Sequence, residues 1–296
     1  METRQKSVSS ADGTRLTAYE CGREGAPALV LCNGLGGNIV AWRHLIDFFG
    51  DRFRLVSWDY RGLYRSSRPA EWTEDASYAM PKHCEDLDAV LAAMDVSGPV
   101  PFIGWSMGVQ VILEYWRRQP ERFNGMMLLN GTAGRPLETA FGGTRWLETV
   151  APHFIKFLEH SAPVLAKVGP YAAQTRSLVG LIKATGLVAP TLDEDVFIDI
   201  AVDFVKLDFS AYSRCFRELA RHDATPALPT VKVPVLVITG DRDLFTPVET
   251  ARNLASAIPD AELEVVSGGS HYTPVEYPMV VHLRIEKFLR EKLGLL

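Results

Sequence analysis

The sequence predicts an α/β fold in which helices cover both faces of a mostly parallel β-sheet. The first observation is that short apolar runs, bounded by Gly, Pro or Asp, alternate with segments of helical spacing up to about residue 135. The second is that this alternation stops over residues 135–225, where only helical spacing remains, and returns after residue 233. Strands that alternate with helices indicate a parallel sheet, so we expect one sheet interrupted by a helical insertion.

The first half of the chain supplies four expected strands with three helices between them. The apolar runs are short enough to be strands buried on both faces, and they cover residues 28–32, 53–58, 100–103 and 126–129. Helices are expected where apolar residues recur at helical spacing, over residues 39–49, 78–94 and 106–119. Ser77 is the expected N-cap of the second helix, and Pro81 suits its first turn.

The insertion and the C-terminal part complete the expected organisation. Thr191 and Glu194 form a capping box ahead of an apolar stripe of helical spacing. Four earlier apolar residues are expected to pack mostly against the core or one another: Phe154, Ile155, Phe157 and Leu158. Beyond the insertion, strands and helices alternate over residues 235–239, 250–258, 263–266 and 280–293. The expected division is therefore a core of residues 1–134 and 226–296 with a helical insertion over residues 135–225.

Composition excludes several classes of protein. Of 296 residues, 47% are hydrophobic and 23% charged, as in a globular domain, and the net charge of −5 argues against nucleic-acid binding. The longest uncharged stretch, residues 96–113, is broken by Gly and Pro and does not predict a membrane span, and no signal peptide is visible. The cysteines are far apart and are expected to be reduced and mostly buried: Cys21, Cys32, Cys84 and Cys215. A cytoplasmic enzyme is the resulting expectation.

The segment around Ser106 carries the pattern most informative about function. Gly104-Trp105-Ser106-Met107-Gly108 has the form Gly-x-Ser-x-Gly, follows an expected strand and begins an expected helix, which is the setting of a nucleophile elbow. The turn is so tight that residues two positions before and after the serine must lack bulk. The start of the helix also favours negative charge that develops beside the serine. Ser106 is therefore the expected nucleophile.

A serine hydroxyl needs a general base, and the base needs a third group to orient it. His271 follows the expected strand 263–266 in the loop Gly-Gly-Ser-His-Tyr, where the base belongs in this chain order. The orienting carboxylate should follow the preceding strand, where Asp241 and Asp243 compete. Asp243 is favoured because the apolar pair after it would pack it inward, whereas Asp241 stands beside an arginine. Asp241 remains the alternative.

Acyl transfer also needs an oxyanion hole, in which one N–H donor is typically worth about 2.7–4 kcal/mol in the transition state. The N–H of Met107, directly after the nucleophile, is the first expected donor. The second is expected in the glycine-rich loop 33–38, because its glycines let the backbone approach a bound oxygen. The N–H of Leu35 is the candidate there.

The order of these motifs resembles the α/β-hydrolase fold family. The motifs that carry the resemblance are Asn33-Gly34, Asp59-Tyr60-Arg61-Gly62, the Ser106 elbow, Gly240-Asp241-Arg242-Asp243 and Gly269-Ser270-His271. The resemblance spans essentially the whole chain and implies an eight-stranded, mostly parallel sheet with a helical cap inserted after the sixth strand. It also implies a triad of Ser106, His271 and Asp243, and the form of the elbow is similar to that of esterases and enol-lactonases.

Two positions depart from the family pattern. Many relatives have His-Gly where this chain has Asn33-Gly34, a change that keeps the backbone donor and alters the side chain beside it. Relatives often carry Arg-Gly-x-Gly-x-Ser, whereas Tyr64 occupies the second glycine position here and is expected to reshape the site entrance. Asn33 and Tyr64, together with Trp105 and Tyr272, are the candidate residues of the substrate pocket.

The expected reaction is hydrolysis of a carboxylic ester with an apolar acyl or alkyl part, without cofactor or metal. Lactone hydrolysis, carbon–carbon bond hydrolysis and cofactor-free perhydrolysis use the same triad and stay open. A non-catalytic ligand-binding protein is disfavoured because all three triad residues are present. A nicotinamide-dependent reductase is disfavoured because Ile39 stands where the dinucleotide pattern needs a third glycine, and dehalogenases or epoxide hydrolases of this fold use an aspartate nucleophile. The expected partner is a small ester-like molecule, and nothing indicates an oligomer.

Overall fold

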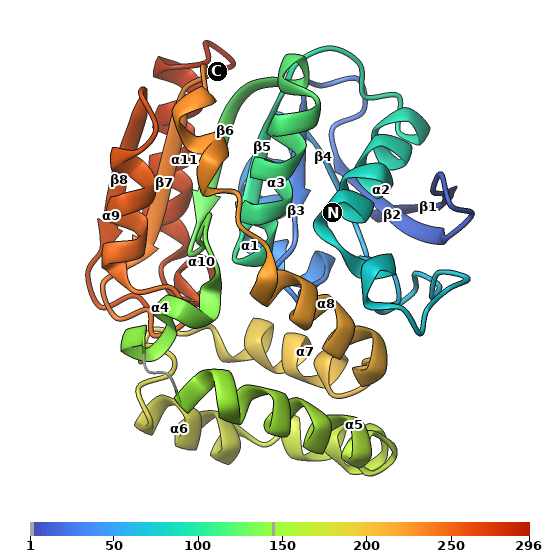
Figure 1. The fold of residues 1–296 in the computed structure, drawn as a ribbon. Coiled ribbons are helices and arrows are strands. Elements are labelled where there is room, and N and C mark those ends of the chain that lie inside the picture. The colour runs from blue at the N-terminus through green and yellow to red at the C-terminus, as the bar shows by residue number, and fades with distance from the viewer. Residues whose placement is uncertain (1–2, 144–145) are drawn as a thin grey trace.

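The computed structural model describes residues 3–143 and 146–296. In this part of the chain eight strands form one sheet in the order β1-β2-β4-β3-β5-β6-β7-β8 (Figure 1). Strand β2 pairs antiparallel with β1 and β4, and every other pairing is parallel. The strands are β1 Thr3–Ser9, β2 Arg15–Gly22, β3 Ala28–Cys32, β4 Arg54–Trp58, β5 Val100–Trp105, β6 Phe123–Leu129, β7 Val235–Gly240 and β8 Ala261–Val266. The mostly parallel sheet expected from the sequence is confirmed.

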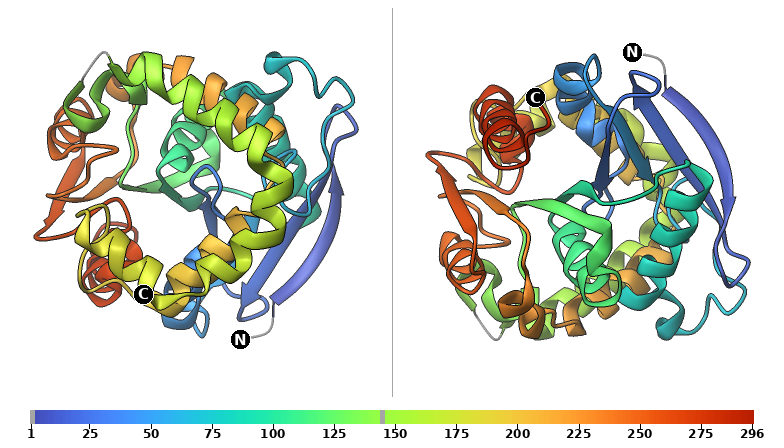
Figure 2. Two further views of the ribbon diagram at one scale, coloured as in Figure 1. Left: turned by 90° about the horizontal axis from the view of Figure 1, so that it is seen from below. Right: turned by 90° about the horizontal axis from the view of Figure 1, so that it is seen from above.

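Helices cover both faces of the sheet, and the strand side chains alternate between two hydrophobic clusters. Val30 and Cys32 of β3 join the cluster that contains residues of α2, α3 and α9, whereas Leu29 and Leu31 join the cluster of α1 and α11. The right-hand view of Figure 2 shows these two groups of helices on opposite sides of the sheet. The core helices are α1 Arg43–Phe49, α2 Met80–Ala93, α3 Met107–Arg118, α9 Val248–Ser256, α10 Thr273–Glu276 and α11 Pro278–Glu291. Burial of both faces explains why the central strands are unbroken apolar runs.

The helices between β6 and β7 lie beyond one end of the sheet, in two layers (Figure 1). They are α4 Pro136–Gly143, α5 Trp146–Ala173, α6 Arg176–Ala184, α7 Glu194–Phe204 and α8 Phe209–Arg221. The left-hand view of Figure 2 shows α5 and α6 nearest the viewer, and Figure 1 shows α7 and α8 between α5 and the sheet. Short 3-10 helices complete the described structure: η1 Ile39–Trp42, η2 Asp75–Tyr78, η3 Pro120–Arg122 and η4 Thr225–Thr230.

Polar contacts attach the inner layer to the core. Asp75 in η2 accepts hydrogen bonds from Arg214 and Arg217 of α8, at 2.9 and 2.8 Å. The amide of Asn38 donates to Asp203 of α7 at 2.9 Å. Both helices therefore have fixed places over the ends of the strands.

The start of α2 differs from the expectation. Ser77 lies inside the 3-10 helix η2, and α2 begins at Met80 after Ala79, whose side chain cannot cap it. Ser77 is therefore not the N-cap of this helix. The carbonyl of Ser77 instead accepts a hydrogen bond from Arg61 at 2.8 Å, so this residue contributes its backbone to a buried ion network. Pro81 does lie in the first turn of α2, as expected.

Two expectations about the insertion are also wrong. The N-cap of α7 is Asp193, whose carboxylate accepts from the N–H groups of Asp195 and Val196, so the capping box starting at Thr191 does not form. A carboxylate directly before the helix satisfies two of its free N–H groups and leaves no role for Thr191. The side chain of Phe157 is 63% exposed and does not pack against the core. Leu158 is half-buried, and the side chains of Phe154 and Ile155 lie outside the described residues.

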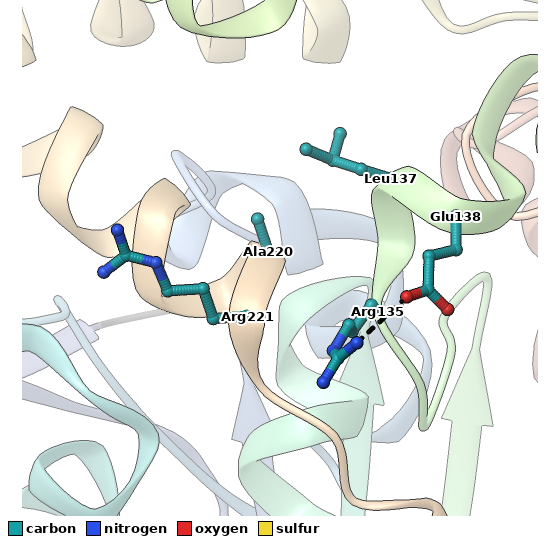
Figure 3. A pocket seen from close by; sticks show the side chains of 5 residues that line it. All are labelled: Arg135, Leu137, Glu138, Ala220 and Arg221. Atoms are coloured by element: carbon teal, nitrogen blue, oxygen red, sulfur yellow. Dashed lines mark hydrogen bonds and ion pairs between the residues drawn. The ribbon is translucent and has the colours of Figure 1, made fainter. Parts of the chain in front are cut away.

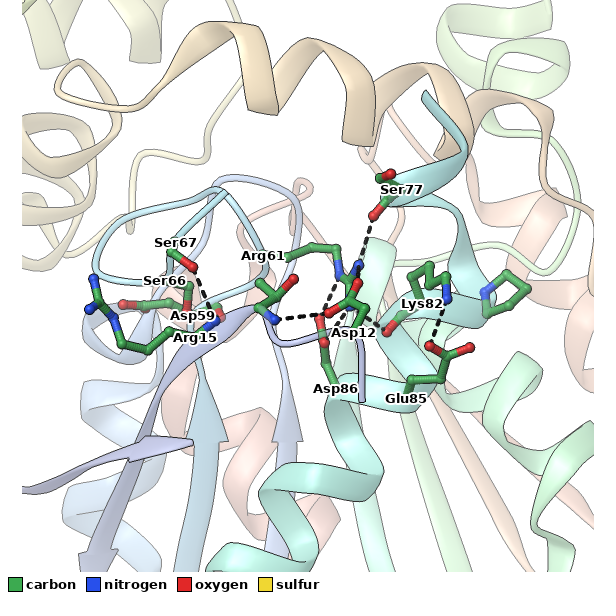
Figure 4. A network of polar contacts seen from close by, with 12 residues as sticks. Asp12, Arg15, Asp59, Arg61, Ser66, Ser67, Ser77, Lys82, Glu85 and Asp86 are labelled. Atoms are coloured by element: carbon green, nitrogen blue, oxygen red, sulfur yellow. Dashed lines mark hydrogen bonds and ion pairs between the residues drawn. The ribbon is translucent and has the colours of Figure 1, made fainter. Parts of the chain in front are cut away.

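A buried ion network fixes the loop that follows β4 (Figure 4). Arg61 is fully buried and donates two hydrogen bonds to Asp86, at 2.8 and 2.6 Å, and one to Asp12 at 2.8 Å. Burial alone would raise the pKa of Asp12, but hydrogen bonds from Thr14 and the charge of Arg61 lower it to about 2. A buried arginine needs such partners, because an unpaired buried charge is strongly destabilising.

Two further observations concern the described part of the chain as a whole. Its four cysteines are all buried and free. No helix in residues 3–143 and 146–296 is both long and apolar enough to cross a lipid bilayer.

Candidate active site

Ser106 lies between β5 and α3 in a strained backbone conformation. Its φ is 56° and its ψ is −115°, and such a positive φ costs a non-glycine residue about 1–3 kcal/mol. A Cβ atom on Gly104 would lie 2.7 Å from the backbone of Gly108, and one on Gly108 would lie 2.1 Å from the carbonyl oxygen of Cys32. Both flanking positions therefore require glycine, for the steric reason given by the sequence pattern. The turn holds Ser106 at the carboxyl end of β5 and at the start of α3.

His271 and Asp243 form a hydrogen-bonded pair at the ends of the neighbouring strands β8 and β7. Nδ1 of His271 lies 2.9 Å from Oδ2 of Asp243, whose side chain is fully buried. Burial would raise the pKa of Asp243, but the charge of His271 and hydrogen bonds from His271 and Thr246 outweigh it and lower the pKa. An ionised Asp243 favours a proton on Nδ1 of His271, which leaves Nε2 able to accept another.

Further hydrogen bonds saturate the Asp243 carboxylate. Oδ1 accepts from the N–H groups of Phe245 and Thr246, both at 2.8 Å, and Oδ2 accepts from the Thr246 hydroxyl at 2.7 Å. The amide of Asn130, at the end of β6, donates to Oδ2 at 3.0 Å. The sequence analysis did not identify Asn130 or Thr246 as neighbours of Asp243. The Asp-x-x-Thr spacing is the local signal that could have indicated Thr246, because the side chain caps its own turn.

The structure places Asp243 rather than Asp241 against His271, but not for the expected reason. Leu244 and Phe245 are 40% and 39% exposed, so apolar packing does not draw Asp243 inward. The hydrogen bonds of its own turn do so instead. Asp241 is exposed and accepts a hydrogen bond from the N–H of Gly268 at 2.7 Å.

The expected nucleophile and base are not hydrogen-bonded to each other within the described residues. Catalytic hydrogen bonds are often long in free enzymes and tighten when substrate binds. The indole N–H of Trp105, next to Ser106, donates to the carbonyl of His271 at 2.9 Å and so links the elbow to the histidine loop. The ring of Tyr272 meets that of Trp105 edge to face, with centroids 5.8 Å apart. Trp105 is buried and Tyr272 is half-buried, and their contact packs the elbow against the histidine loop.

The loop after β3 passes beside Ser106. A Cβ atom on Gly34 would lie 3.3 Å from Cβ of Ser106. Asn33 is 1% exposed, donates to the carbonyl of Trp58 at 2.7 Å and accepts from the indole of Trp42 at 2.6 Å. Asn33 therefore anchors the loop and does not line a pocket, because both ends of its amide are already bonded.

Tyr64 also contacts this loop. Its φ is 51°, so the residue adopts the left-handed conformation that glycine would adopt without strain. Its hydroxyl donates a hydrogen bond to the carbonyl of Gly36. The N–H of Leu35 lies in the same turn. Met107 is the first residue of α3, so its N–H is among the four donors that have no acceptor within the helix.

Two cavities lie near these residues. The one at Ser106 has a volume of about 20 Å³, and its lining includes Gln110 and Thr132 from the core with Pro136 and Leu219 from the insertion. The larger one, about 340 Å³, lies between α4 and α8 (Figure 3). Its lining consists of Arg135, Leu137, Glu138, Ala220 and Arg221. The larger cavity contains none of the expected catalytic residues, whereas the lining of the small one includes Ser106 and Met107. The four pocket candidates of the sequence analysis are absent from both linings.

The matches with protein families agree with this architecture. Residues 27–161 match a family model described as the alpha/beta hydrolase fold, and residues 213–292 match one described as TAP-like protein. With the eight-stranded sheet and the helical segment between β6 and β7, these matches show that the chain has the α/β-hydrolase fold. The family resemblance inferred from the sequence motifs is confirmed.

Individual relatives are similar along nearly the whole chain. The 3-oxoadipate enol-lactonase 2 of Acinetobacter baylyi is 27% identical over 285 residues, which cover 96% of this chain and 97% of that protein. The probable oxidoreductase EphD of Mycobacterium tuberculosis is 27% identical over 95% of this chain, which spans only 48% of that protein's length. A thermophilic esterase of Thermogutta terrifontis superposes with a TM-score of 0.72 at 21% identity, over 97% of this chain and 98% of that one. At that identity, the structural likeness concerns the fold.

Proposed function

We propose that this protein is a serine hydrolase that cleaves carboxylic esters through an acyl-enzyme intermediate. The observation that carries the proposal is the strained Ser106 at the carboxyl edge of the sheet where His271 is paired with the buried Asp243. Strain of this kind persists only where the surrounding structure enforces it, and it is concentrated at functional sites. The α/β-hydrolase fold supports the reaction class, because esterases and an enol-lactonase share it.

In the proposed mechanism, Oγ of Ser106 attacks the ester carbonyl while Nε2 of His271 takes the serine proton. Asp243 holds the imidazole orientation and stabilises the imidazolium that forms. The N–H groups of Leu35 and Met107 stabilise the oxyanion of the tetrahedral intermediate. His271 then protonates the leaving alkoxide, which departs as the alcohol. Water repeats the sequence on the acyl-enzyme, and the acid leaves with Ser106 restored.

Residues 135–225 act in this proposal as a cap over the nucleophile. Pro136 and Leu219 from this segment close the cavity at Ser106, whose volume of about 20 Å³ is that of a single water. An ester cannot enter such a space, so α4, which contributes Pro136 to the lining, must shift to admit substrate. The apolar residues that face this cavity suit an acyl or alkyl part without charge.

A lactone is the second candidate substrate. The similarity to 3-oxoadipate enol-lactonase 2 over nearly all of both chains favours it, and a lactone is a cyclic ester that the same three groups can open. Carbon–carbon bond hydrolysis and perhydrolysis use the same groups, but no contact in this structure favours either.

Labelling with a fluorophosphonate probe tests the nucleophile. The wild-type protein is expected to be labelled and Ser106→Ala to remain unlabelled, with the matched variant Ser256→Ala, on the surface of the core, labelled like wild type. A panel of soluble esters, lactones and β-diketones, with Ser106→Ala as the blank, then identifies the bond that is cleaved. Equal labelling of wild type and Ser106→Ala would overturn the proposal.

The pH dependence of kcat/KM tests the base. His271 must be neutral to take the serine proton, so kcat/KM is expected to fall towards acidic pH. His271→Ala should lower kcat by about 10⁴-fold or more while the protein stays folded. A rate that does not change between about pH 5 and 8 would contradict a histidine base.

A further inference from the structure

Helix α5 carries an apolar stripe on the side that faces away from the rest of the protein. The exposed fractions are 63% for Phe157, 63% for Val164, 58% for Val168 and 75% for Tyr171. Successive members are seven, four and three residues apart, which places them on one face of the helix. Leu181 of α6, also 63% exposed, belongs to the same outer layer. We call these five residues the outer stripe. Exposed apolar surface of this extent marks a site of interaction.

The charges beside the outer stripe are of one sign. Among the described side chains of α5, no Asp or Glu is exposed, and the exposed His and Lys residues are His153, Lys156, His160 and Lys167. Neither Lys156 nor Lys167 forms an ion pair with any described residue. Glu159 is half-buried and lies about 200° around the helix from Phe157. An apolar and basic surface therefore lies on a chain whose net charge is −5.

The outer stripe with its basic neighbours fits an anionic lipid surface better than it fits a second copy of the chain. Two copies that joined their outer stripes would bring the lysines of both α5 helices together, and like charges at an interface disfavour association. At an interface of anionic lipid and water, the apolar residues would enter the acyl boundary while Lys156 and Lys167 met the headgroups. We propose that the outer stripe docks this protein on anionic lipid surfaces, with α5 lying in the plane of the interface.

The position of the stripe fits that role. From Phe157 to Tyr171 it extends about 20 Å along the helix, enough for several side chains to insert together. Helices α7 and α8 lie between α5 and the sheet (Figure 1), and Leu219 of α8 closes the cavity at Ser106. Docking through α5 would therefore turn the covered end of the sheet towards the lipid. The proposal goes beyond ester hydrolysis and does not depend on it, because it concerns binding alone.

Cosedimentation of the full chain with vesicles tests the proposal without measuring turnover. One preparation contains phosphatidylcholine alone, and the other an equal mixture of phosphatidylcholine and phosphatidylglycerol. We expect the protein to sediment with the mixed vesicles and to be released by added salt. The double variant Phe157→Ser/Val164→Ser should weaken partitioning about tenfold or more, because two apolar side chains no longer insert. The double variant Lys156→Glu/Lys167→Glu should lose the preference for anionic vesicles.

A matched control comes from α11, where Met279 and Leu283 are 55% and 52% exposed and far along the chain from the outer stripe. Met279→Ser/Leu283→Ser removes similar apolar surface and should partition like wild type. Failure of the wild-type protein to bind the mixed vesicles would overturn the proposal, and so would equal losses in the α5 and α11 variants. A wild-type dimer in sedimentation velocity that Phe157→Ser/Val164→Ser converts to monomer would identify a second copy as the occupant instead.

Discussion

Tyr64→Phe tests whether one hydroxyl braces the loop that is expected to bind the oxyanion. The hydroxyl of Tyr64 donates to the carbonyl of Gly36, one residue after the expected donor Leu35. Phenylalanine keeps the ring and the strained φ of 51° and removes only this bond. A hydrogen bond of this kind contributes about 1 kcal/mol. If the bond holds the loop in place for the transition state, kcat should fall by about fivefold, since 1.36 kcal/mol in the barrier is tenfold in rate.

The control for this prediction is Tyr115→Phe. The hydroxyl of Tyr115 donates to Asp88 at 2.7 Å from the third turn of α3, away from the oxyanion loop. Urea unfolding should show a loss of about 1 kcal/mol for each variant. Steady-state hydrolysis of a soluble p-nitrophenyl ester should show a lower kcat for Tyr64→Phe alone, with KM little changed, because the oxyanion exists only along the reaction path. Equal kcat values for the two variants would refute the bracing role.

Three further predictions concern stability and are measured by urea unfolding. Gly108→Ala should destabilise the fold by about 3 kcal/mol, because its Cβ would lie 2.1 Å from a carbonyl oxygen of β3. The control is Gly180→Ala on α6, where a Cβ would lie in open space, and this variant should stabilise the fold by about 0.5–1 kcal/mol. Arg61→Met should cost about 3–5 kcal/mol by leaving Asp86 buried and unpaired, and adding Asp86→Asn should recover part of the loss. Because the pKa of Asp243 is lowered, its ionised form stabilises the fold above the ordinary value of about 3.9, and this contribution is lost as the pH falls through the lowered pKa. The stability difference between wild type and Asp243→Asn should therefore shrink in acid, and a difference that grew would contradict the lowered pKa.

The strands that could be predicted are those whose residues are buried on both faces. The run at residues 28–32 coincides with β3 because all five side chains are buried, so every position is apolar. β1 was not predicted, because six of its seven residues are exposed and its sequence, TRQKSVS, contains no apolar run. β8 was found only in part, since Val266 alone among its residues is fully buried. A strand can therefore be recognised from its local composition only to the extent that its side chains are buried. The side chains of edge strands are mostly not buried, so these strands are hard to recognise.

In the candidate site, too, features that depend on nearby residues could be predicted from the sequence, and features that depend on distant contacts could not. Gly104 and Gly108 are required by collisions within a few residues of Ser106, so a short pattern reveals them. Asp243 is held by the N–H groups of its own turn, yet the apolar pair that favoured it from the sequence is exposed. Leu219 reaches the cavity only because α8 is fixed to η2 by ion pairs with Asp75, between segments about 140 residues apart. A steric requirement within one turn produces a short sequence pattern that can be recognised. The lining of the site depends instead on how a distant helix packs against the core, and no local spacing of residues predicts that packing.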